Sequence, residues 1–320
     1  MQKTDLLTEQ AQRAYVEPKP HTHHLRYDLV LMLVTIIWGA TFLVTKFSLH
    51  LVGPFTYLGL CYTVATLTLV LIFHKRVLRI TRAELLAGVI VGIALFTGYA
   101  CQTVGLQWTS VSKAGFITGL YVPLVPLFAL FFLRQRVPGT AIVGMFLSVI
   151  GLLLLALNKQ FTLTFGPGEW LILCCAFGFA LHIVFISKFA PTVDVINLAI
   201  IQLAVTSLLS FLIVPLAHEP IAPPPLLAWV PILLMGTFDM AFCLLMMNWV
   251  QQFMSSTRAA LLYSLEPMWA ALFGVLLAGD VLSVVAWIGC GCVFVGMVVG
   301  RLEKISFHLR KTTAPPEIDV

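Results

Sequence analysis

Glu266 and Pro267 stand side by side within LLYSLEPMWAALFGVLLAGD, an apolar stretch that covers residues 261–280. An ionised carboxylate in hydrocarbon is costly, and proline removes a backbone hydrogen bond that lipid cannot replace. A carboxyl at this depth is typical of a site that exchanges a proton for a cationic or zwitterionic substrate. The alternative is a protonated carboxyl that joins two helices through a hydrogen bond.

Two further ionisable side chains, Asp239 and His182, interrupt apolar runs. Asp239 is expected at a depth similar to that of Glu266, either as a second functional acid or as a structurally paired one. His182 favours hydrogen bonding between helices, with proton relay or substrate contact as the alternative. Asn248 follows Asp239 by nine residues. At about 100° per residue it falls on the opposite helix face, so the two are not expected to line one pore.

Polar side chains at helical spacing predict the walls of a cavity. One group is Trp38, Thr41 and Thr45, and another is Tyr99, Gln102 and Thr103. Side chains three or four residues apart share a helix face, so each group suits a cavity wall. The alternative for the Trp and Tyr side chains is packing, or anchoring at the membrane interface.

The elements that position these side chains are predicted to be membrane helices. The chain has 320 residues, of which 60% are hydrophobic and 10% charged, and its mean hydropathy is +0.99. A soluble domain has about 45–50% apolar and about 25% charged residues. The net charge of +5 is therefore attributed to topology and anionic lipid headgroups rather than to nucleic acid.

The amino-terminal residues 1–27 are polar and show no signal-peptide cleavage site, so we expect the first span to remain as an anchor. All seven cysteines lie in apolar spans, which favours neither a disulfide framework nor a zinc site. The HTHH stretch at 21–24 is typical of a solvated tail rather than a metal site. No metal and no cofactor are expected.

Apolar runs of about 20 residues predict ten membrane helices. The predicted spans are 29–49, 55–73, 84–105, 112–133, 138–157, 168–188, 195–215, 227–250, 257–278 and 283–301. With both termini cytoplasmic, sixteen of the nineteen basic residues fall on the cytoplasmic side, all except Lys46, Lys113 and Lys159. The positive-inside rule favours this orientation, and an odd number of spans would separate the two basic ends.

Two segments of the chain share a register, which indicates an internal repeat. With residues 110–157 written above 255–302, matching residues stand 145 positions apart: Ser110 and Ser255, Ala114 and Ala259, Gly144 and Gly289, Gly151 and Gly296. Five helices per half invert the second copy, a transporter architecture with the substrate site between the halves. Pro123 and Pro267, 144 positions apart, are expected to bend their helices and act as hinges.

The same register pairs Glu266 with Tyr121 and Tyr263 with Thr118. Each helix then carries two polar side chains at i and i+3 on one face, so we expect two inverted helices to meet across a central cavity. The glycines in residues 289–300 are expected to pack the last helix or a dimer face.

Three stretches carry a family pattern: IIWGATFLVTK (36–46), QTVGLQWTSVSKAGFITGLYVPLVPLFALFFLRQR (102–136) and STRAALLYSLEPMWAALFGVLLAGDVLS (256–283). They resemble the EamA-type carriers of the drug/metabolite transporter superfamily. The resemblance implies an all-α membrane protein of ten helices in two inverted repeats, at 28–160 and 166–302. Cytoplasmic tails would cover 1–27 and 303–320, and helices 1 to 4 and 6 to 9 would line a central cavity.

Individual residues follow or depart from that family pattern. The matching positions are Trp38, Gly39 and Lys46 in helix 1 and Ala259, Glu266 and Pro267 in helix 9. Gln135 and Asp280 stand where the family often has Glu, and Asp239 is not part of the pattern. The departure at Asp239 is expected to reflect a particular substrate or coupling ion.

We therefore expect a secondary transporter of the bacterial cytoplasmic (inner) membrane that exports a small metabolite, such as an amino acid, by alternating access. The alternatives are an uptake carrier, an intramembrane enzyme, which no HExxH-like spacing supports, and a structural or channel-like protein. Expected partners are a small-molecule substrate, a possible coupling proton and the lipid bilayer, and the chain is expected to be a monomer or homodimer. Predicted binding or coupling residues are Glu266, Asp239, Tyr263, Tyr121, Thr118, His182, Trp38, Thr41, Tyr99 and Gln102.

Overall fold

The computed structural model describes residues 24–109, 111–135, 137–156, 166–220, 222–278 and 283–300. Within these ranges the chain forms helices joined by turns, without a strand. Large apolar side chains cover the outside of the bundle; Phe131, Leu71 and Leu277, for example, are more than 70% exposed. Such a surface suits lipid, and it confirms the prediction of an all-helical membrane protein with several spans.

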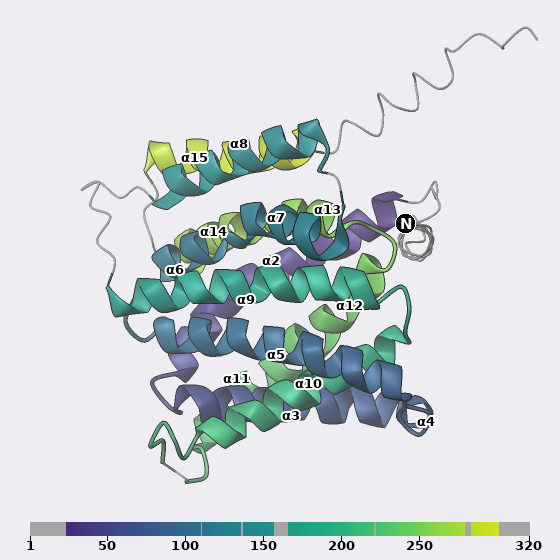
Figure 1. Ribbon diagram of the computed structural model, residues 1–320. Helices are drawn as coiled ribbons and strands as arrows, with labels where there is room; N and C mark the ends of the chain where they lie inside the picture. Colours follow the sequence, from purple (N-terminus) through teal and green to yellow (C-terminus); the bar gives the residue numbers. More distant parts are fainter. Residues whose placement is uncertain are drawn as a thin grey trace, which may run out of the picture.

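The helices follow one another in two series (Figure 1). The first series is α2 His24–Ser48, α3 Pro54–Ile72, α4 His74–Val77, α5 Arg82–Gly105, α6 Val111–Thr118, α7 Tyr121–Leu133 and α8 Gly139–Ala156. The second is α9 Pro167–Phe189, α10 Val195–Ile213, α11 Leu226–Leu234, η1 Met235–Cys243, α12 Leu244–Gln251, α13 Ser256–Tyr263, α14 Glu266–Ala278 and α15 Val284–Val299.

Eight helical segments of the described chain are long and apolar enough to cross a membrane. They are Leu25–Ser48, Pro54–Ile72, Arg82–Gly105, Ala114–Leu133, Pro167–Phe189, Val195–Ile213, Leu226–Gln251 and Ser256–Leu277. Two shorter apolar segments, Gly139–Leu154 and Trp287–Val299, belong to α8 and α15. A full count of ten spans therefore stays a prediction.

The second series runs opposite to the first. Lys46, near the end of α2, donates from Nζ to the carbonyl oxygen of Thr109 at 2.9 Å, just beyond the end of α5. The Thr109 hydroxyl in turn donates to Glu169 Oε1 at 2.7 Å, in the first turn of α9. Because α9 begins where α2 ends, the opening helices of the two series are antiparallel, as an inverted repeat requires.

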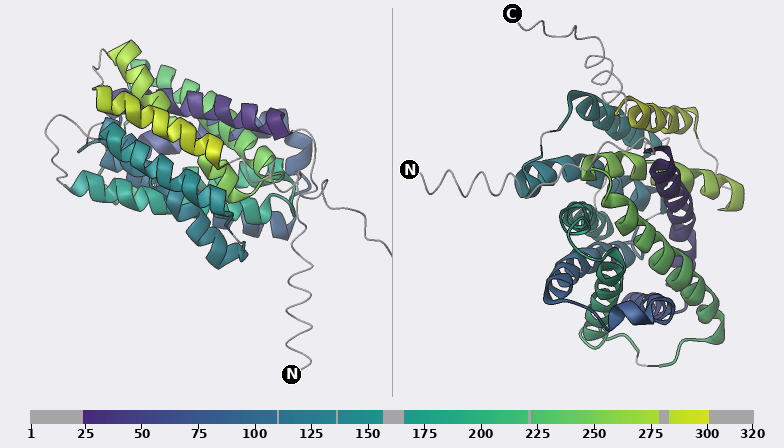
Figure 2. Two further views of the ribbon diagram at one scale, coloured as in Figure 1. Left: turned by 90° about the horizontal axis from the view of Figure 1, so that it is seen from above. Right: turned by 90° about the vertical axis from the view of Figure 1, so that its right-hand side faces the viewer.

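The helices α8 and α15 pack on each other through matching glycines at the edge of the bundle (Figure 2). A Cβ on Gly144 would lie 2.5 Å from the carbonyl oxygen of Gly296, and one on Gly151 would lie 2.6 Å from that of Gly289. Gly144 and Gly289 are register partners, as are Gly151 and Gly296, so the contact obeys the pseudo-twofold symmetry of the repeat. These glycines therefore pack the last helix against α8.

The spans that carry the two prolines are each interrupted by a two-residue turn. Helix α6 ends at Thr118 and α7 begins at Tyr121, while α13 ends at Tyr263 and α14 begins at Glu266. Pro123 and Pro267 thus lie in the first turns of α7 and α14. Backbone N–H groups in a first turn have no acceptor within the helix, so a proline there removes no helical hydrogen bond. Each span therefore consists of two helical segments, and the expected hinge role of the two prolines stays a prediction.

The span Leu226–Gln251 also departs from the predicted regular helix, because its middle third is a π-helix, η1. Gly236 lets η1 approach α3, since a Cβ there would lie 2.6 Å from Val64 Cγ1 and 2.8 Å from the carbonyl oxygen of Cys61. π-Helical turns are rare in proteins, but those that occur are often found at functional sites. The buried residue Asp239 lies within this segment.

Candidate functional site

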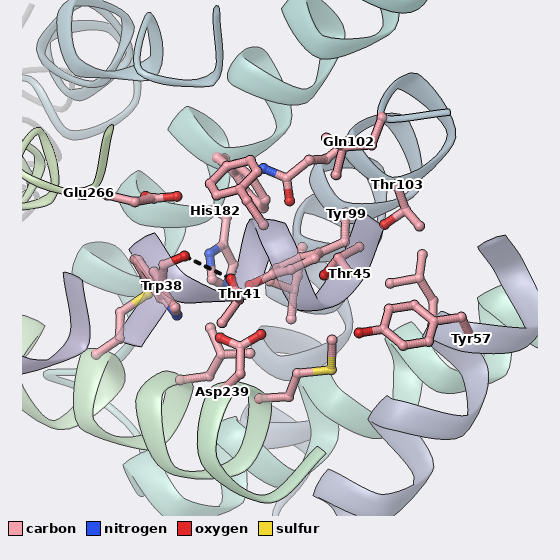
Figure 3. Close-up of a pocket in the computed structure, with 18 of the residues that line it drawn as sticks. Trp38, Thr41, Thr45, Tyr57, Tyr99, Gln102, Thr103, His182, Asp239 and Glu266 are labelled. Atoms are coloured by element: carbon pink, nitrogen blue, oxygen red, sulfur yellow. Dashed lines mark hydrogen bonds between the residues drawn. The ribbon is translucent and has the colours of Figure 1, made fainter. Parts of the chain in front are cut away.

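A pocket lies between the helices of the two series, and Figure 3 shows side chains that line it. It is lined by Trp38, Thr41, Phe42, Thr45, Tyr57, Leu58, Leu95, Tyr99, Gln102, Thr103, Leu106, Phe179, His182, Ile183, Asp239, Met240, Leu244, Met247 and Glu266. These residues come from α2, α3, α5, α9, η1, α12 and α14, together with Leu106, which directly follows α5. Both series of helices therefore build its wall, whereas α8 and α15 contribute no lining residue.

The pocket brings together seven of the ten predicted binding or coupling residues: Glu266, Asp239, His182, Trp38, Thr41, Tyr99 and Gln102. The other three lie directly behind the wall. Tyr121 donates its hydroxyl to Glu266 Oε2 at 3.4 Å, and Gln102 Nε2 donates to Thr118 Oγ1 at 3.4 Å. The ring of Tyr263 lies 5.4 Å from that of Trp38.

Sequence reasoning missed Tyr57 and most of the apolar wall. Tyr57 is fully buried in α3, and its hydroxyl lacks a hydrogen-bond partner. A single tyrosine near a helix end resembles an ordinary interface anchor, so its type alone did not point to the pocket. Phe42, Phe179 and Met240 lie in uniformly apolar runs, where the sequence offers no signal that separates pocket from lipid or core.

Two acidic side chains face the pocket. Asp239 is 2% exposed and Glu266 is 7% exposed, and they lie within electrostatic range of each other. No Lys or Arg is among the lining residues, and Lys46 is instead bound to the Thr109 carbonyl near the end of α2. The described wall therefore offers acceptors for protons or cations but no cationic side chain for an anion.

His182 lines the pocket and also joins two helices. One of its ring nitrogens, Nε2, lies 2.9 Å from Gln202 Oε1 in α10. The geometry is that of an interhelical hydrogen bond, the first of the two roles considered for this residue. Its other ring atoms remain at the pocket wall, so contact with a ligand is open to it as well.

Asn248 does not share the pocket with Asp239. It is fully buried in α12, and both side-chain polar atoms lack a hydrogen-bond partner. It is absent from the pocket lining, as expected. The expectation assumed a rotation of about 100° per residue, however, and the π-helix η1 between the two residues departs from that value.

The pocket reaches toward the end of the bundle where α2 ends and α3 begins, because Thr45 and Tyr57 lie there. The opposite end is filled by Tyr27, Asp28, Trp249, Phe253 and Arg258, here called the closing cluster. Tyr27 stacks on Phe253 with ring centroids 4.9 Å apart and meets Trp249 edge-on at 5.4 Å. Arg258 donates from one nitrogen to both carboxylate oxygens of Asp28 at 2.7 Å.

A chain of polar contacts connects the closing cluster region with the pocket. Ser187 of α9 donates to Gln251 Oε1 at 2.9 Å, and Gln251 Nε2 donates to the Tyr263 hydroxyl at 3.1 Å. Tyr263 then packs on Trp38 at the pocket wall. Helices α2, α9, α12 and α13 are thereby joined beneath the pocket, which keeps this end shut.

Comparison with known proteins gives this architecture a family. A 30% identical relative, an uncharacterized transporter of Archaeoglobus fulgidus, aligns over 86% of this chain and 86% of its own length. The uncharacterized inner membrane transporter YedA of Escherichia coli K12 is 25% identical over 88% of this chain and 92% of its own.

A solved crystal structure shares the fold with a TM-score of 0.72 at 22% identity, covering 87% of this chain and 98% of the other. The family model for the EamA-like transporter family matches residues 25–157 and again residues 166–300. The two matches correspond to the two antiparallel series of helices. The chain therefore belongs to the EamA-like transporter family.

Proposed function

We propose that this protein is a secondary transporter that exports a small amphipathic metabolite across the bacterial cytoplasmic (inner) membrane. The observation that supports it best is a pocket lined by both inverted series of helices, with a packed aromatic cluster and an ion pair at one end of the bundle. A binding site placed between inverted repeats is accessible alternately from each side when one half rocks against the other. Such a carrier needs no cofactor and no catalytic residue.

The pocket supports a small ligand with both apolar and polar groups. Aromatic and aliphatic side chains make most of the wall, and Thr41, Gln102 and the two acids supply polar groups at a few points. This pattern of many apolar contacts with few directed polar ones suits a metabolite such as an amino acid or a related compound.

Opening the sealed end requires the closing cluster to separate. Its members come from the start of α2, the end of α12, the turn after it and the start of α13. Helices α13 and α14 are separate rods joined at Ser264 and Leu265, so α13 can move with the cluster while α14 keeps Glu266 at the pocket. The break therefore allows one end to open without moving the whole span.

Glu266 is the proposed coupling residue. It begins α14, faces the pocket and accepts a long hydrogen bond from Tyr121, which belongs to the inverted counterpart of its own span. A carboxyl that contacts both the ligand space and the opposite repeat is placed to bind a proton in one state and release it in the other. Proton exchange for substrate would then drive export.

The orientation proposal follows from the positive-inside rule, which puts both termini and the closing cluster on the cytoplasmic side. A monomer or homodimer in the lipid bilayer, without nucleic acid, completes the proposal. An uptake carrier would have the same architecture, so direction is decided by transport assays rather than by the fold.

Substrate counterflow in proteoliposomes tests the carrier proposal. Vesicles preloaded with single amino acids, nucleobases or polyamines are diluted into trace labelled compound, and at least one should accumulate label transiently and saturably. Protein-free vesicles provide the baseline. Flux that never saturates would indicate a channel, and binding without any counterflow would contradict transport.

A reversible lock on the closing cluster tests alternating access directly. Tyr27→Cys and Phe253→Cys, in a background without the seven native cysteines, place two thiols where the stacked rings now meet. A short thiol cross-linker should stop counterflow, and a reductant that cleaves it should restore counterflow. The two single-cysteine variants are the controls. Full transport by the cross-linked double variant would overturn alternating access at this end.

A further inference from the structure

Asp239 stands out from the other pocket residues because its charge has no visible partner. The residue is 2% exposed, lines the pocket, and its Oδ1 lacks a hydrogen-bond partner. A buried polar atom without a partner is costly, and a buried charge more so. A ligand group that donates hydrogen bonds and carries positive charge would remove that cost.

The surroundings of Asp239 define which ligand group fits. Trp38 lies beside Asp239, yet its indole Nε1 also lacks a hydrogen-bond partner of normal geometry. The hydroxyls of Tyr57 and Tyr99 lie within electrostatic range of the carboxylate. Figure 3 shows the carboxylate of Asp239 directed into the pocket, with Trp38 and Tyr57 to either side of it in that view. The carboxylate is thus surrounded by aromatic side chains.

We propose that Asp239 and the aromatic side chains around it form a subsite for the ammonium group of a primary amine with an apolar body. The proposal deepens the carrier function proposed above and rests on it for its biological use. An ammonium group has three donors and a charge opposite to that of Asp239. Aromatic faces attract cations further through their quadrupole, most strongly for Trp.

Charge around the pocket argues against an anion and against a purely neutral ligand. Glu266 is the second acid of the lining, and no Lys or Arg is among the lining residues. An anion would therefore meet two carboxyl groups and no cationic side chain, while a neutral ligand would leave Asp239 without a counter-charge. A cationic group supplies the counter-charge that Asp239 lacks, and the carboxylate of a zwitterion would find donors only in uncharged groups and His182.

The other lining residues indicate that the part of the ligand beyond its ammonium group is apolar. Phe42, Leu58, Leu95, Phe179, Met240, Leu244 and Met247 make a continuous apolar lining beside the acids. Methionine adapts to varied apolar shapes because it is unbranched and polarisable. An amine with an aromatic or branched aliphatic body suits this lining, because its apolar part meets apolar side chains.

Asp239 lies in the π-helix η1, three residues after Gly236, the glycine through which η1 approaches α3. Asp239 and Met240 of η1 both line the pocket. The irregular backbone is therefore part of the proposed subsite, and π-helical turns are often found at functional sites.

Calorimetric titration of the purified protein at neutral pH tests the subsite with three probes of similar shape. These are 2-phenylethylamine, the neutral 2-phenylethanol and the anionic 3-phenylpropionate. The amine should bind at least about tenfold more tightly than the alcohol, the effect of a charge-assisted hydrogen bond, and the anion should bind most weakly. Equal affinity for amine and alcohol would overturn the proposal without any variant.

Variants then assign the preference to one side chain. Asp239→Asn should lower amine affinity at least about tenfold while alcohol affinity stays within about twofold. Asp239→Glu should retain the preference for the amine. Asp194→Asn is the matched control, because it removes the same charge at a distant helix cap and Asn caps as well as Asp.

The outcomes separate this proposal from the carrier function. If Asp239→Asn binds the amine like the unaltered protein, the subsite is wrong, and the counterflow screen still decides whether the protein is a carrier. If the amine binds through Asp239 but neither it nor any screened compound gives counterflow, the subsite holds and the carrier function fails.

Discussion

The two repeats share a backbone but differ in the chemistry that they bring to the pocket. The broken spans match, because Tyr121 begins α7 and Glu266 begins α14, 145 positions apart, and the two side chains meet at 3.4 Å. Leu95 and Asp239 stand 144 positions apart and both line the pocket, but the helices that carry them differ in backbone structure. Leu95 lies in the regular helix α5, whereas Asp239 lies in the π-helix η1.

All ionisable acid and histidine side chains of the pocket come from the second repeat. They are His182, Asp239 and Glu266, while the first repeat contributes threonines, Gln102 and aromatic or aliphatic side chains. Under the proposed function, the symmetric breaks would serve movement, and the second repeat would supply the charged groups of the pocket. A carrier built this way can change its substrate or coupling ion through one repeat without disturbing the shared hinges.

The comparison depends on the inversion of the repeats. The inversion predicts that equivalent loops lie on opposite sides of the membrane, so that a loop on the outer side is labelled from outside and a loop on the cytoplasmic side is not. Ile80→Cys should be protected from an impermeant thiol reagent added to intact cells, whereas Asp280→Cys should be labelled, because the basic residues place them on opposite sides. Residue 280 lies outside the described residues, so the prediction rests on sequence alone.

The labelling experiment uses a background without the seven native cysteines, of which Cys174 is exposed. Permeabilised cells are the control for reactivity of each position. Strong labelling at residue 80 together with none at residue 280 in intact cells would contradict the proposed topology.

The second prediction contrasts the register partners Glu266 and Tyr121. Glu266→Gln is nearly isosteric but cannot ionise, so it should fold normally and lose at least about tenfold of transport driven by a pH gradient while retaining exchange at equal pH. Tyr121→Phe removes only one long hydrogen bond and should change either mode by less than about threefold. Proteoliposomes with an imposed pH gradient measure both.

Asp239→Asn is the control for the neighbouring acid. The ammonium subsite predicts that it loses amine transport in both modes, because binding itself is weakened. If Glu266→Gln keeps full gradient-driven transport and Asp239→Asn abolishes it while sparing exchange, the coupling role belongs to Asp239.

Much of this arrangement could be predicted from the sequence, and the exceptions have physical reasons. Apolar runs located the spans. Glu266 stood out as a candidate because an ionisable side chain within a membrane span is costly and is usually kept for a function. The breaks before Tyr121 and Glu266 were expected as bends, since proline alone does not say whether the preceding turn unwinds. The π-helix at Asp239 has no pattern of its own, because one wide turn barely alters the apolar periodicity.

The third prediction tests whether the repeats are held together as symmetrically as their glycines suggest. Gly151→Ala places a Cβ 2.6 Å from the carbonyl oxygen of Gly289, so α8 and α15 must separate, at a cost of about 1–3 kcal/mol of stability. Gly144→Ala meets Gly296 in the same way and should cost about as much. Thermal unfolding in detergent measures both.

Gly291→Ala is the matched control on α15, since no neighbouring atom lies within 4 Å of its added Cβ. It should leave stability unchanged or raise it by up to about 1 kcal/mol, because Ala favours a helix more than Gly does. A loss at Gly291 equal to that at Gly151 would show that helix propensity or lipid contact, rather than the α8–α15 contact, dominates.

The last prediction concerns the shared hinges, where the smallest effects are expected. Pro123→Ala and Pro267→Ala each restore a backbone N–H in the first turn of α7 or α14, which allows the preceding break to close into continuous helix. Ligand contacts remain, because neither proline lines the pocket, so binding should stay within about twofold while transport falls about threefold to fivefold. Pro126→Ala is the control, since Pro126 lies inside α7, beyond the break, and its replacement should not join α6 to α7. If the two hinge variants transport as fast as the control, the breaks are fixed by packing around Tyr121 and Glu266, and the moving element must be sought at the closing cluster instead.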